Sequence, residues 1–231
     1  MRDDTIIDLN MERSRAGRLD AMRRVEEQMK LREKYSFSVD WFSRHLPVWN
    51  QLVLPYRAAG VRVLEVGCFE GAATTWLLDH VLVDDQSRMD VCDTFQGNAD
   101  RAASETTYDE MEGVKDVFQR NIKLTGNDHK VQVHQQMSSD FLCSLPRQPT
   151  YDVAYIDGSH VAKHVLEDAV GVWPLLRDNG LLIFDDYCWD LLPNEWERPK
   201  VAIDAFLACY HPELQVLHRD LQVLVKKCRL P

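Results

Sequence analysis

Residues 63–75 read V-L-E-V-G-C-F-E-G-A-A-T-T, an apolar, β-branched run that enters a glycine turn and leaves it as a helix. Gly67 directly follows the run, and Gly71 precedes the helical residues. Glycine allows a sharp bend there and lets a ligand approach the main chain closely. The spacing is Gly-x-x-x-Gly, which differs from the Gly-x-Gly-x-x-Gly fingerprint of dinucleotide-binding folds. The stretch therefore predicts a strand–turn–helix unit with a ligand-facing turn.

The same alternation of strand and helix continues along the chain. Predicted strands cover 61–66, 88–92, 131–134, 153–156 and 181–184, and predicted helices cover 72–83, 114–124, 138–145, 161–176 and 201–210. Two further runs, 214–217 and 221–225, flank a tight antiparallel connection. Repeated strand–helix units favour a parallel sheet with helices on both faces. We therefore predict a doubly wound, mostly parallel α/β domain over residues 35–231.

Residues 1–34 form a predicted N-terminal helical extension. Residues 5–34 lack proline, and Leu19, Met22, Val25 and Met29 recur at helical spacing. This pattern is typical of a charged helix with a narrow apolar stripe. The stripe offers a surface for packing on the domain or on a second subunit of a homo-oligomer.

Composition limits the compartment and the partners. The chain has 231 residues, enough for one domain with a full core, and no apolar run reaches the roughly 18–20 residues of a membrane span. Asp3, Asp4 and Asp8 stand where a signal peptide needs an apolar core. We therefore expect a cytoplasmic protein without a membrane partner. The six cysteines lack any Cys-x-x-Cys pair, which predicts buried free thiols rather than a zinc site.

The net charge of −10 is unevenly distributed. Residues 1–34 hold nearly equal numbers of basic and acidic side chains, so the acidic excess lies in residues 35–231. An acidic body repels phosphate backbones. We therefore expect no nucleic-acid partner.

Acidic residues lie at or near the ends of several predicted strands, where ligands bind in open parallel sheets. Glu65 and Glu70 flank Gly67, and Asp93 ends the second strand. Carboxylates beside a glycine turn suit a ligand that carries an amino group or a sulfonium. Asp93 is placed to accept hydrogen bonds from ribose hydroxyls.

Three more carboxylates predict a metal site. Asp157 ends the fourth strand, and Asp185 and Asp186 end the fifth. Neighbouring strands lie about 5 Å apart, so these groups repel one another unless a cation or shared protons neutralise them. Oxygen ligands favour Mg²⁺, with Ca²⁺ or Mn²⁺ as alternatives. His160 follows Asp157 by three residues and can act as a general base near neutral pH.

Four motifs resemble those of class I S-adenosylmethionine-dependent methyltransferases. They are V-L-E-V-G-C-F-E-G, M-D-V-C-D-T-F, Y-D-V-A-Y-I-D-G-S-H and L-L-I-F-D-D-Y, within roughly residues 36–227. They are most similar to the metal-dependent O-methyltransferases that act on sugar or catechol hydroxyls. The resemblance implies a Rossmann-like, seven-stranded sheet of order 3-2-1-4-5-7-6 with an antiparallel seventh strand.

The resemblance also implies roles for individual residues. The methionine end of the cofactor would contact Glu65, Gly67, Glu70 and Gly71, the ribose would contact Asp93, and the adenine would lie beside Ser138. Asp157, Asp185 and Asp186 would hold Mg²⁺, with His160 as base, and the acceptor would be a small hydroxylated molecule. Some metal-dependent relatives have Asp-Asn where this chain has Asp185-Asp186, so the ligand set and the ion stay open.

Three other interpretations compete with this one. A metal-independent methyltransferase of the same fold would keep its activity in a chelator. A nicotinamide-dependent oxidoreductase is disfavoured by the missing second glycine. A non-catalytic cofactor-binding or scaffold protein would act through residues 1–34. Around the site, residues 94–113 predict a mobile lid, and residues 187–198 add aromatic side chains.

Overall fold

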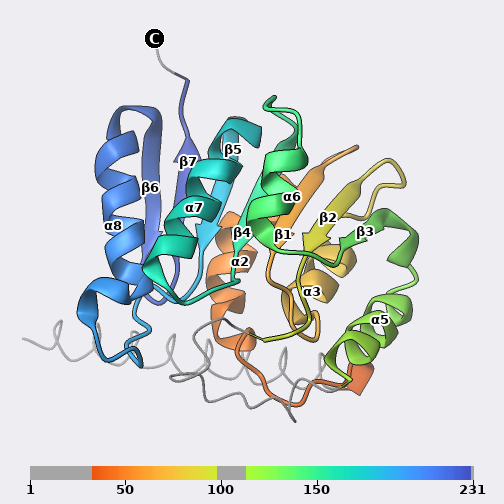
Figure 1. Cartoon of the computed structure of the whole chain (residues 1–231). Helices are drawn as coiled ribbons and strands as arrows, with labels where there is room; N and C mark the ends of the chain where they lie inside the picture. The colour runs from red at the N-terminus through yellow and green to blue at the C-terminus, as the bar shows by residue number, and fades with distance from the viewer. Residues whose placement is uncertain (1–32, 98–112, 230–231) are drawn as a thin grey trace, which may run out of the picture.

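The computed structural model describes residues 33–97 and 113–229. Its centre is a seven-stranded sheet of order β3-β2-β1-β4-β5-β7-β6 (Figure 1). The strands are β1 (Arg62–Val66), β2 (Arg88–Cys92), β3 (Val131–His134), β4 (Tyr151–Ile156), β5 (Leu176–Phe184), β6 (Leu214–Arg219) and β7 (Val223–Lys227). Strands β1 to β5 pair in parallel, and β7 runs antiparallel to β5 and β6. The doubly wound fold and its strand order are confirmed.

Helices cover both faces of the sheet (Figure 1). One layer contains α2 (Leu46–Leu52), α3 (Ala72–His80) and α5 (Val114–Leu124), and the other contains α6 (Ser138–Ser144), α7 (Ala162–Val172) and α8 (Pro199–Tyr210). Short 3-10 turns are η1 (Ser43–His45), η2 (Leu54–Tyr56), η3 (Asp128–Lys130), η4 (Trp173–Leu175), η5 (Glu195–Glu197) and η6 (His211–Glu213). Successive strand residues face opposite sides, so Val63 joins the first core layer and Leu64 the second.

The aromatic segment before β1 is part of the domain. Trp49 packs edge-on against Phe42 and Trp76, with ring centroids 4.7 Å and 5.3 Å away. Its indole Nε1 donates a 2.8 Å hydrogen bond to Gln222 Oε1, beside β7. These contacts tie the segment across the sheet and place its preceding residues near the strand ends.

The structure corrects several details of the prediction. The helix predicted over 161–176 ends at Val172, and the strand predicted over 221–225 runs from Val223 to Lys227. Strand β5 begins at Leu176, five residues before the predicted start. The prediction missed this start because residues 177–179 are polar, and the pairing register with β4 shifts between Tyr151 and Val153. All six cysteines are free, but only Cys68 and Cys92 are buried. The prediction of buried thiols is therefore wrong for Cys143, Cys188 and Cys209, which are exposed, and for Cys228, which is half-exposed.

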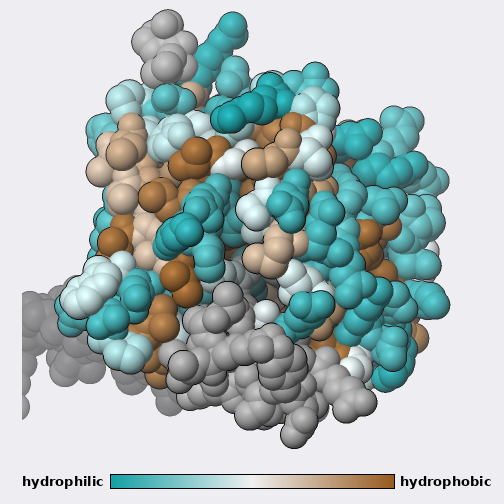
Figure 2. Space-filling model, in the orientation of Figure 1, coloured by the Kyte–Doolittle hydropathy of each residue, from teal (hydrophilic) through white to brown (hydrophobic). Residues whose placement is uncertain are grey.

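Two predicted segments lie outside the described residues. These are almost all of the helix over 5–34 and most of the lid over 94–113, so both stay predictions. The space-filling view shows polar residues over much of the face formed by α6, α7 and α8, with apolar residues between them (Figure 2). Within 33–97 and 113–229, no helix combines the length and apolarity needed to cross a bilayer.

Candidate active site

A cavity of about 730 Å³ opens at the carboxyl ends of the parallel strands. Because β1, β2, β4 and β5 all end there, residues that are distant in sequence meet around it. Nine of the ten predicted site residues line it: Glu65, Gly67, Glu70, Asp93, Ser138, Asp157, His160, Asp185 and Asp186. Gly71 is the exception, because it lies behind the turn and not on the cavity wall.

Both glycines of the turn are required by the backbone. Gly67 has φ +81°, and a Cβ there would lie 2.0 Å from the carbonyl oxygen of Asp157. Gly71 has φ +84° and precedes α3, and its Cβ would lie 2.8 Å from the ring of Phe118. A side chain at either position would clash as well as strain the backbone. Their first role is therefore packing of the turn against β4 and α5.

Glu65 places a carboxyl group without a full set of partners on the cavity wall. The side chain is 1% exposed, and Thr74 Oγ1 donates a 2.5 Å hydrogen bond to its Oε2. Its Oε1 finds no donor within the described part of the chain. Burial raises the pKa of Glu65 to about 8. A cationic ligand group here would supply the missing donor and stabilise the carboxylate.

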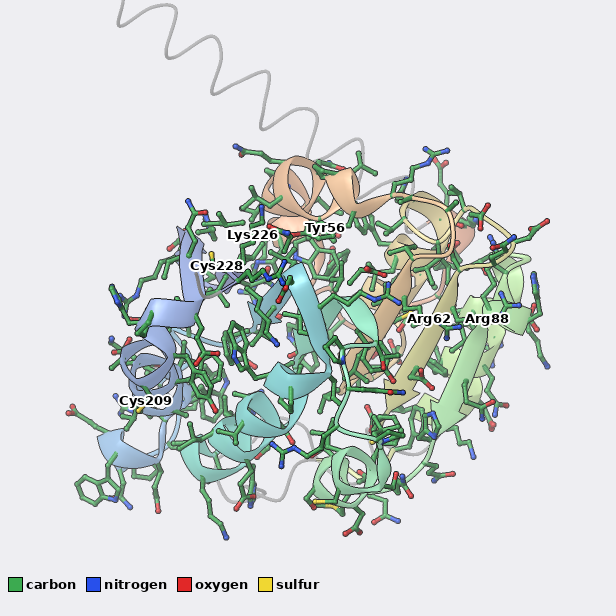
Figure 3. The ribbon with its side chains drawn as sticks, turned by 90° about the horizontal axis from the view of Figure 1, so that it is seen from above. Tyr56, Arg62, Arg88, Cys209, Lys226 and Cys228 are labelled. Carbon is green, nitrogen blue, oxygen red and sulfur yellow. The ribbon has the colours of Figure 1, made fainter. Side chains whose placement is uncertain are left out.

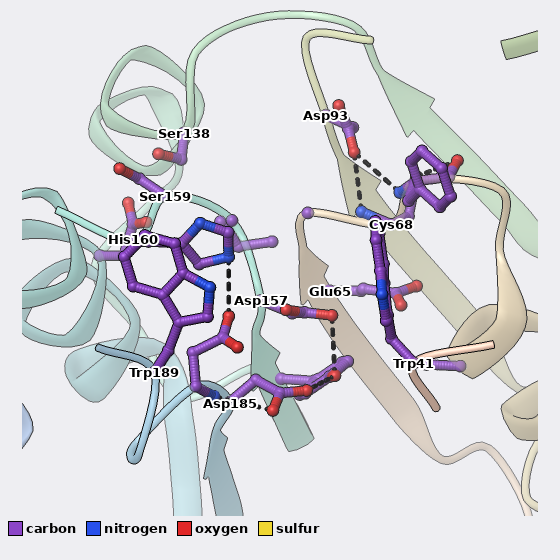
Figure 4. Close-up of a pocket in the computed structure, with 18 of the residues that line it drawn as sticks. Trp41, Glu65, Cys68, Asp93, Ser138, Asp157, Ser159, His160, Asp185 and Trp189 are labelled. Carbon is purple, nitrogen blue, oxygen red and sulfur yellow. Dashed lines mark hydrogen bonds and ion pairs between the residues drawn. The ribbon is translucent and has the colours of Figure 1, made fainter. Parts of the chain in front are cut away.

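The other two acids of this region hold the turn in place. Asp93 Oδ2 accepts hydrogen bonds from the main-chain N–H groups of Cys68, at 2.8 Å, and Phe69, at 3.1 Å (Figure 4). Glu70 Oε2 accepts a 2.6 Å hydrogen bond from the N–H of Ser38. Both carboxylates also face the cavity. Sequence reasoning anticipated their place on the wall but missed this structural role.

Ser138 lies at the start of α6, beside an acid that the sequence analysis missed. Asp168, on α7, is 2% exposed and lines the same cavity as Ser138. Burial raises the pKa of Asp168 to about 6. It shares the buried stripe of α7 with Val165 and Ala169. An acidic residue on the apolar, buried face of a predicted helix was the sequence pattern that could have indicated Asp168.

Tyr155 joins two of the predicted metal-site carboxylates. Its phenol oxygen lies 2.8 Å from Asp157 Oδ2 and is also hydrogen-bonded to Asp185 Oδ2. One phenol proton cannot be donated to both carboxylates at once. Burial, together with repulsion from Asp185 and Asp186, raises the pKa of Asp157 well above its usual range, which favours its protonated form.

Two further residues, both missed by the sequence analysis, surround Asp185. Gln222 Nε2 donates a 3.0 Å hydrogen bond to Asp185 Oδ2. His45 is 5% exposed, lines the cavity, and places Nε2 3.8 Å from Asp185 Oδ1. Burial lowers the pKa of His45, which favours the neutral imidazole and makes this contact a weak one. His45 belongs to the segment before β1, where no motif marks it.

His160 is held between an acid and an aromatic ring (Figure 4). Its Nε2 lies 2.9 Å from Asp186 Oδ2, and its ring stacks on Trp189 with centroids 4.3 Å apart and planes at 21°. Helix α7 begins at Ala162, one residue after the predicted start, so His160 lies in the loop before the helix. The carboxylate and the indole together fix the direction of the imidazole.

A family profile described as "Methyltransferase domain" matches residues 64–187, which is more than half of the chain. The chain belongs to this family. The recognition of a class I, S-adenosylmethionine-dependent methyltransferase is thereby confirmed. No curated protein sequence matches this methyltransferase at a significant level.

Solved structures share its fold at low sequence identity. An O-methyltransferase from Bacillus cereus in complex with SAH is 17% identical over 89% of this chain and 90% of that chain, with a TM-score of 0.59. TomG from Streptomyces achromogenes, involved in tomaymycin synthesis and bound to SAM, is 14% identical over 82% of each chain, with a TM-score of 0.60. MycE from the mycinamycin biosynthetic pathway, in complex with Mg, SAH and mycinamycin VI, is 18% identical over 87% of this chain and 53% of that chain, with a TM-score of 0.59.

The donor chemistry of the methyltransferase suits a hard cation. Asp157, Asp185 and Asp186 offer only oxygen, and their mutual repulsion is what a divalent cation would relieve. In the described ranges, however, no three His, Cys, Asp or Glu side chains converge closely enough to hold a metal ion. Asp186 is turned toward His160, and Tyr155 lies between the other two acids. The magnesium site therefore stays a prediction.

Proposed function

We propose that this methyltransferase transfers a methyl group to a hydroxyl group of a small molecule, such as a sugar, a glycoside or a catechol. The main observation that supports this proposal is that His160 and three carboxylates line the same cavity as the glycine turn and Glu65. S-Adenosylmethionine would supply the electrophilic methyl group, and Glu65 Oε1 provides an acceptor for its ammonium group. Asp157, Asp185 and Asp186 would hold Mg²⁺, which would lower the pKa of the acceptor hydroxyl.

In this proposal the protein itself positions the base and collects the proton. Asp186 requires a donor, so the imidazole of His160 carries its proton on Nε2. The imidazole of His160 would accept the proton of the acceptor hydroxyl. Stacking on Trp189 restricts rotation of the ring.

The experiment that tests the proposal is thermal unfolding with S-adenosylmethionine, with and without Mg²⁺, and with NAD as the control ligand. At about 100 times its dissociation constant, a ligand stabilises the native state by roughly 2.7 kcal/mol. We expect S-adenosylmethionine to raise the unfolding midpoint, Mg²⁺ to raise it further, and NAD to leave it unchanged. A response to NAD alone would contradict the assignment.

The affinity for S-adenosylmethionine should rise with pH up to about 8. Glu65, with a pKa near 8, is protonated in the free protein at neutral pH, whereas an ammonium group binds its ionised form. Binding then releases a proton, so the affinity increases by up to about tenfold per pH unit below pH 8 and levels off above it. Isothermal titration between pH 6 and 9 measures this slope. The Glu65→Gln variant should show none of it, and an equal slope in that variant would assign the proton to another group.

The pH dependence of folding should have the opposite sign. The pKa of Glu65 is raised from 4.5 in the unfolded chain to about 8 in the folded protein, so the folded state binds the extra proton between these values. The free energy of unfolding contributed by this group is therefore greatest below pH 4.5 and decreases as pH rises to about 8. Urea unfolding of the ligand-free protein should show this decrease, and Glu65→Gln should reduce it.

One observation favours a second candidate, a metal-independent methyltransferase. The pair of Asp186 and His160, at 2.9 Å, is a carboxylate–imidazole base that needs no cation for its orientation. The two candidates differ in a chelator. Methyl transfer that persists in EDTA would favour the metal-independent enzyme, and transfer that is lost and restored by Mg²⁺ would favour the first.

We also propose that residues 1–34 form an extension outside the catalytic domain and could support a homo-oligomer. The compact fold of the described residues from Tyr35 onward supports this boundary. Comparing the molecular mass of the full chain with that of residues 35–231 tests it. A cytoplasmic location and the lack of a nucleic-acid partner stay predictions from composition.

A further inference from the structure

The charge of the cavity wall is strongly one-sided. Among the described residues that line it, nine are Asp or Glu, and Arg44 is the one Lys or Arg. Arg62 and Arg88 lie instead at the opposite ends of the strands, where they begin two neighbouring parallel strands (Figure 3). A cleft of one sign with low-dielectric walls concentrates ligands of the other sign. An acceptor that carries an anion would therefore be repelled from this cavity.

The methyl donor and a divalent cation would account for only some of these acidic side chains. Glu65, Glu70 and Asp93 lie at the glycine turn, and Asp157, Asp185 and Asp186 surround the base. Glu167 and Asp168 lie on α7, and Asp190 belongs to none of these groups. It is exposed, lines the cavity directly after Trp189, and has no ion-pair partner among the described residues. Its carboxylate is therefore available to the ligand that approaches His160.

Two indole rings flank the acidic centre (Figure 4). Trp189 stacks on His160 on one side, and Trp41 lies on the other side against Phe69, with ring centroids 5.1 Å apart. Trp41 is 48% exposed although it lines the cavity. Exposed indole faces bind the rings of sugars and aromatic compounds, and they also attract ammonium groups. The aromatic walls and the acidic side chains of the cavity thus both favour a ligand with a ring and a positive charge.

We propose that the acceptor is a hydroxylated ring that carries an ammonium group, either an amino sugar or an arylalkyl amine, and that Asp190 selects for its charge. This inference rests on the proposed function, because it concerns the acceptor of the same cavity. It extends that function by naming the charge of the substrate.

Matched ligands test the inference. The catechol series has one reacting ring and charges of +1, 0 and −1 in dopamine, 4-methylcatechol and 3,4-dihydroxyphenylacetate. The parallel sugar series consists of methyl glucosaminide, methyl glucoside and methyl glucuronide. We expect binding to the enzyme saturated with S-adenosylhomocysteine and Mg²⁺ to weaken by about fivefold at each step, in whichever series binds. The difference should shrink between roughly 0.02 M and 0.5 M salt. Equal affinities, tightest binding of the anion, or no binding in both series would overturn the inference.

Two substitutions of opposite sign sharpen the test. Asp190→Asn should lower the preference for dopamine over 4-methylcatechol by about threefold, and Arg44→Gln should raise it by a similar factor. Asp178→Asn is the control, because this exposed acid lies in β5, away from the cavity, and should change nothing. An unchanged preference in Asp190→Asn would refute the role of Asp190.

Methyl transfer is measured separately from binding in the same ligands. Preferential binding of the cationic members without any methylation would leave the charge preference intact and remove the proposed function. Methylation at equal efficiency for all three charges would keep the proposed function and overturn the preference.

Discussion

Replacing Asp157 by Asn should reduce methyl transfer on the order of 10³-fold while leaving the fold intact. The substitution keeps the shape of the side chain, but it removes the charge that would bind a cation together with Asp185 and Asp186. It also removes a carboxyl group whose ionisation is opposed by burial and by its acidic neighbours. The unfolding midpoint of the ligand-free variant should therefore equal or exceed that of the parent protein.

The control for this prediction is Asp178→Asn, which removes an exposed carboxylate outside the cavity. It should retain full activity and full binding of S-adenosylmethionine. Binding of the methyl donor should also persist in Asp157→Asn, because Glu65 and the glycine turn are unchanged. If Asp157→Asn transfers methyl groups at the parental rate, the proposed role of the carboxylate centre is wrong.

Replacing Gly67 by Ala should cost about 3 kcal/mol of folding stability or more. The added Cβ would lie 2.0 Å from the carbonyl oxygen of Asp157, a main-chain atom that cannot move without disturbing β4. Overpacking of this kind and the strain of a positive φ each cost about 1–3 kcal/mol. Urea unfolding followed by circular dichroism measures the loss directly.

The Gly126→Ala variant is a control that separates the cost of the steric clash at Gly67 from the cost of the backbone strain at a positive φ. Gly126 has φ +74°, close to that of Gly67, but a Cβ there meets nothing within 4 Å. It should cost only about 1–2 kcal/mol, the penalty of the left-handed conformation alone. Equal losses in the two variants would show that the contact with Asp157 contributes nothing.

Local patterns were sufficient for most of the fold. Strands β2 and β3 and helix α5 have the predicted ends, because their apolar periodicity is strong and their borders carry turn residues. The beginning of β5 was missed because residues 177–179 are polar and have no partner on β4, whose register shifts between Tyr151 and Val153, and because Asn179 has a positive φ. The shared carboxyl ends of the strands likewise placed nine of the ten predicted site residues on the cavity wall.

The contacts within the site join residues that are far apart in the sequence, and local sequence patterns do not reveal such pairs. His45 reaches Asp185 from the segment before β1, and Gln222 reaches it from the connection before β7. No local spacing marks either residue. Tyr155 is a different case, because it lies two residues before Asp157 on the same strand and therefore on the same face. A phenol at that position was a readable signal, although its link to Asp185 required the neighbouring strand.

The close contact between Gly67 and Asp157 has a consequence for engineering. It joins the main chain of the glycine turn to the main chain of Asp157 in one rigid unit, so neither backbone segment can move alone. The two indoles that line the cavity, Trp41 and Trp189, stand on two connecting segments that this contact does not restrain. Exchanging residues 37–45 and 188–191 between relatives should therefore redirect the choice of acceptor in a chimaera while the methyl-donor half is inherited unchanged.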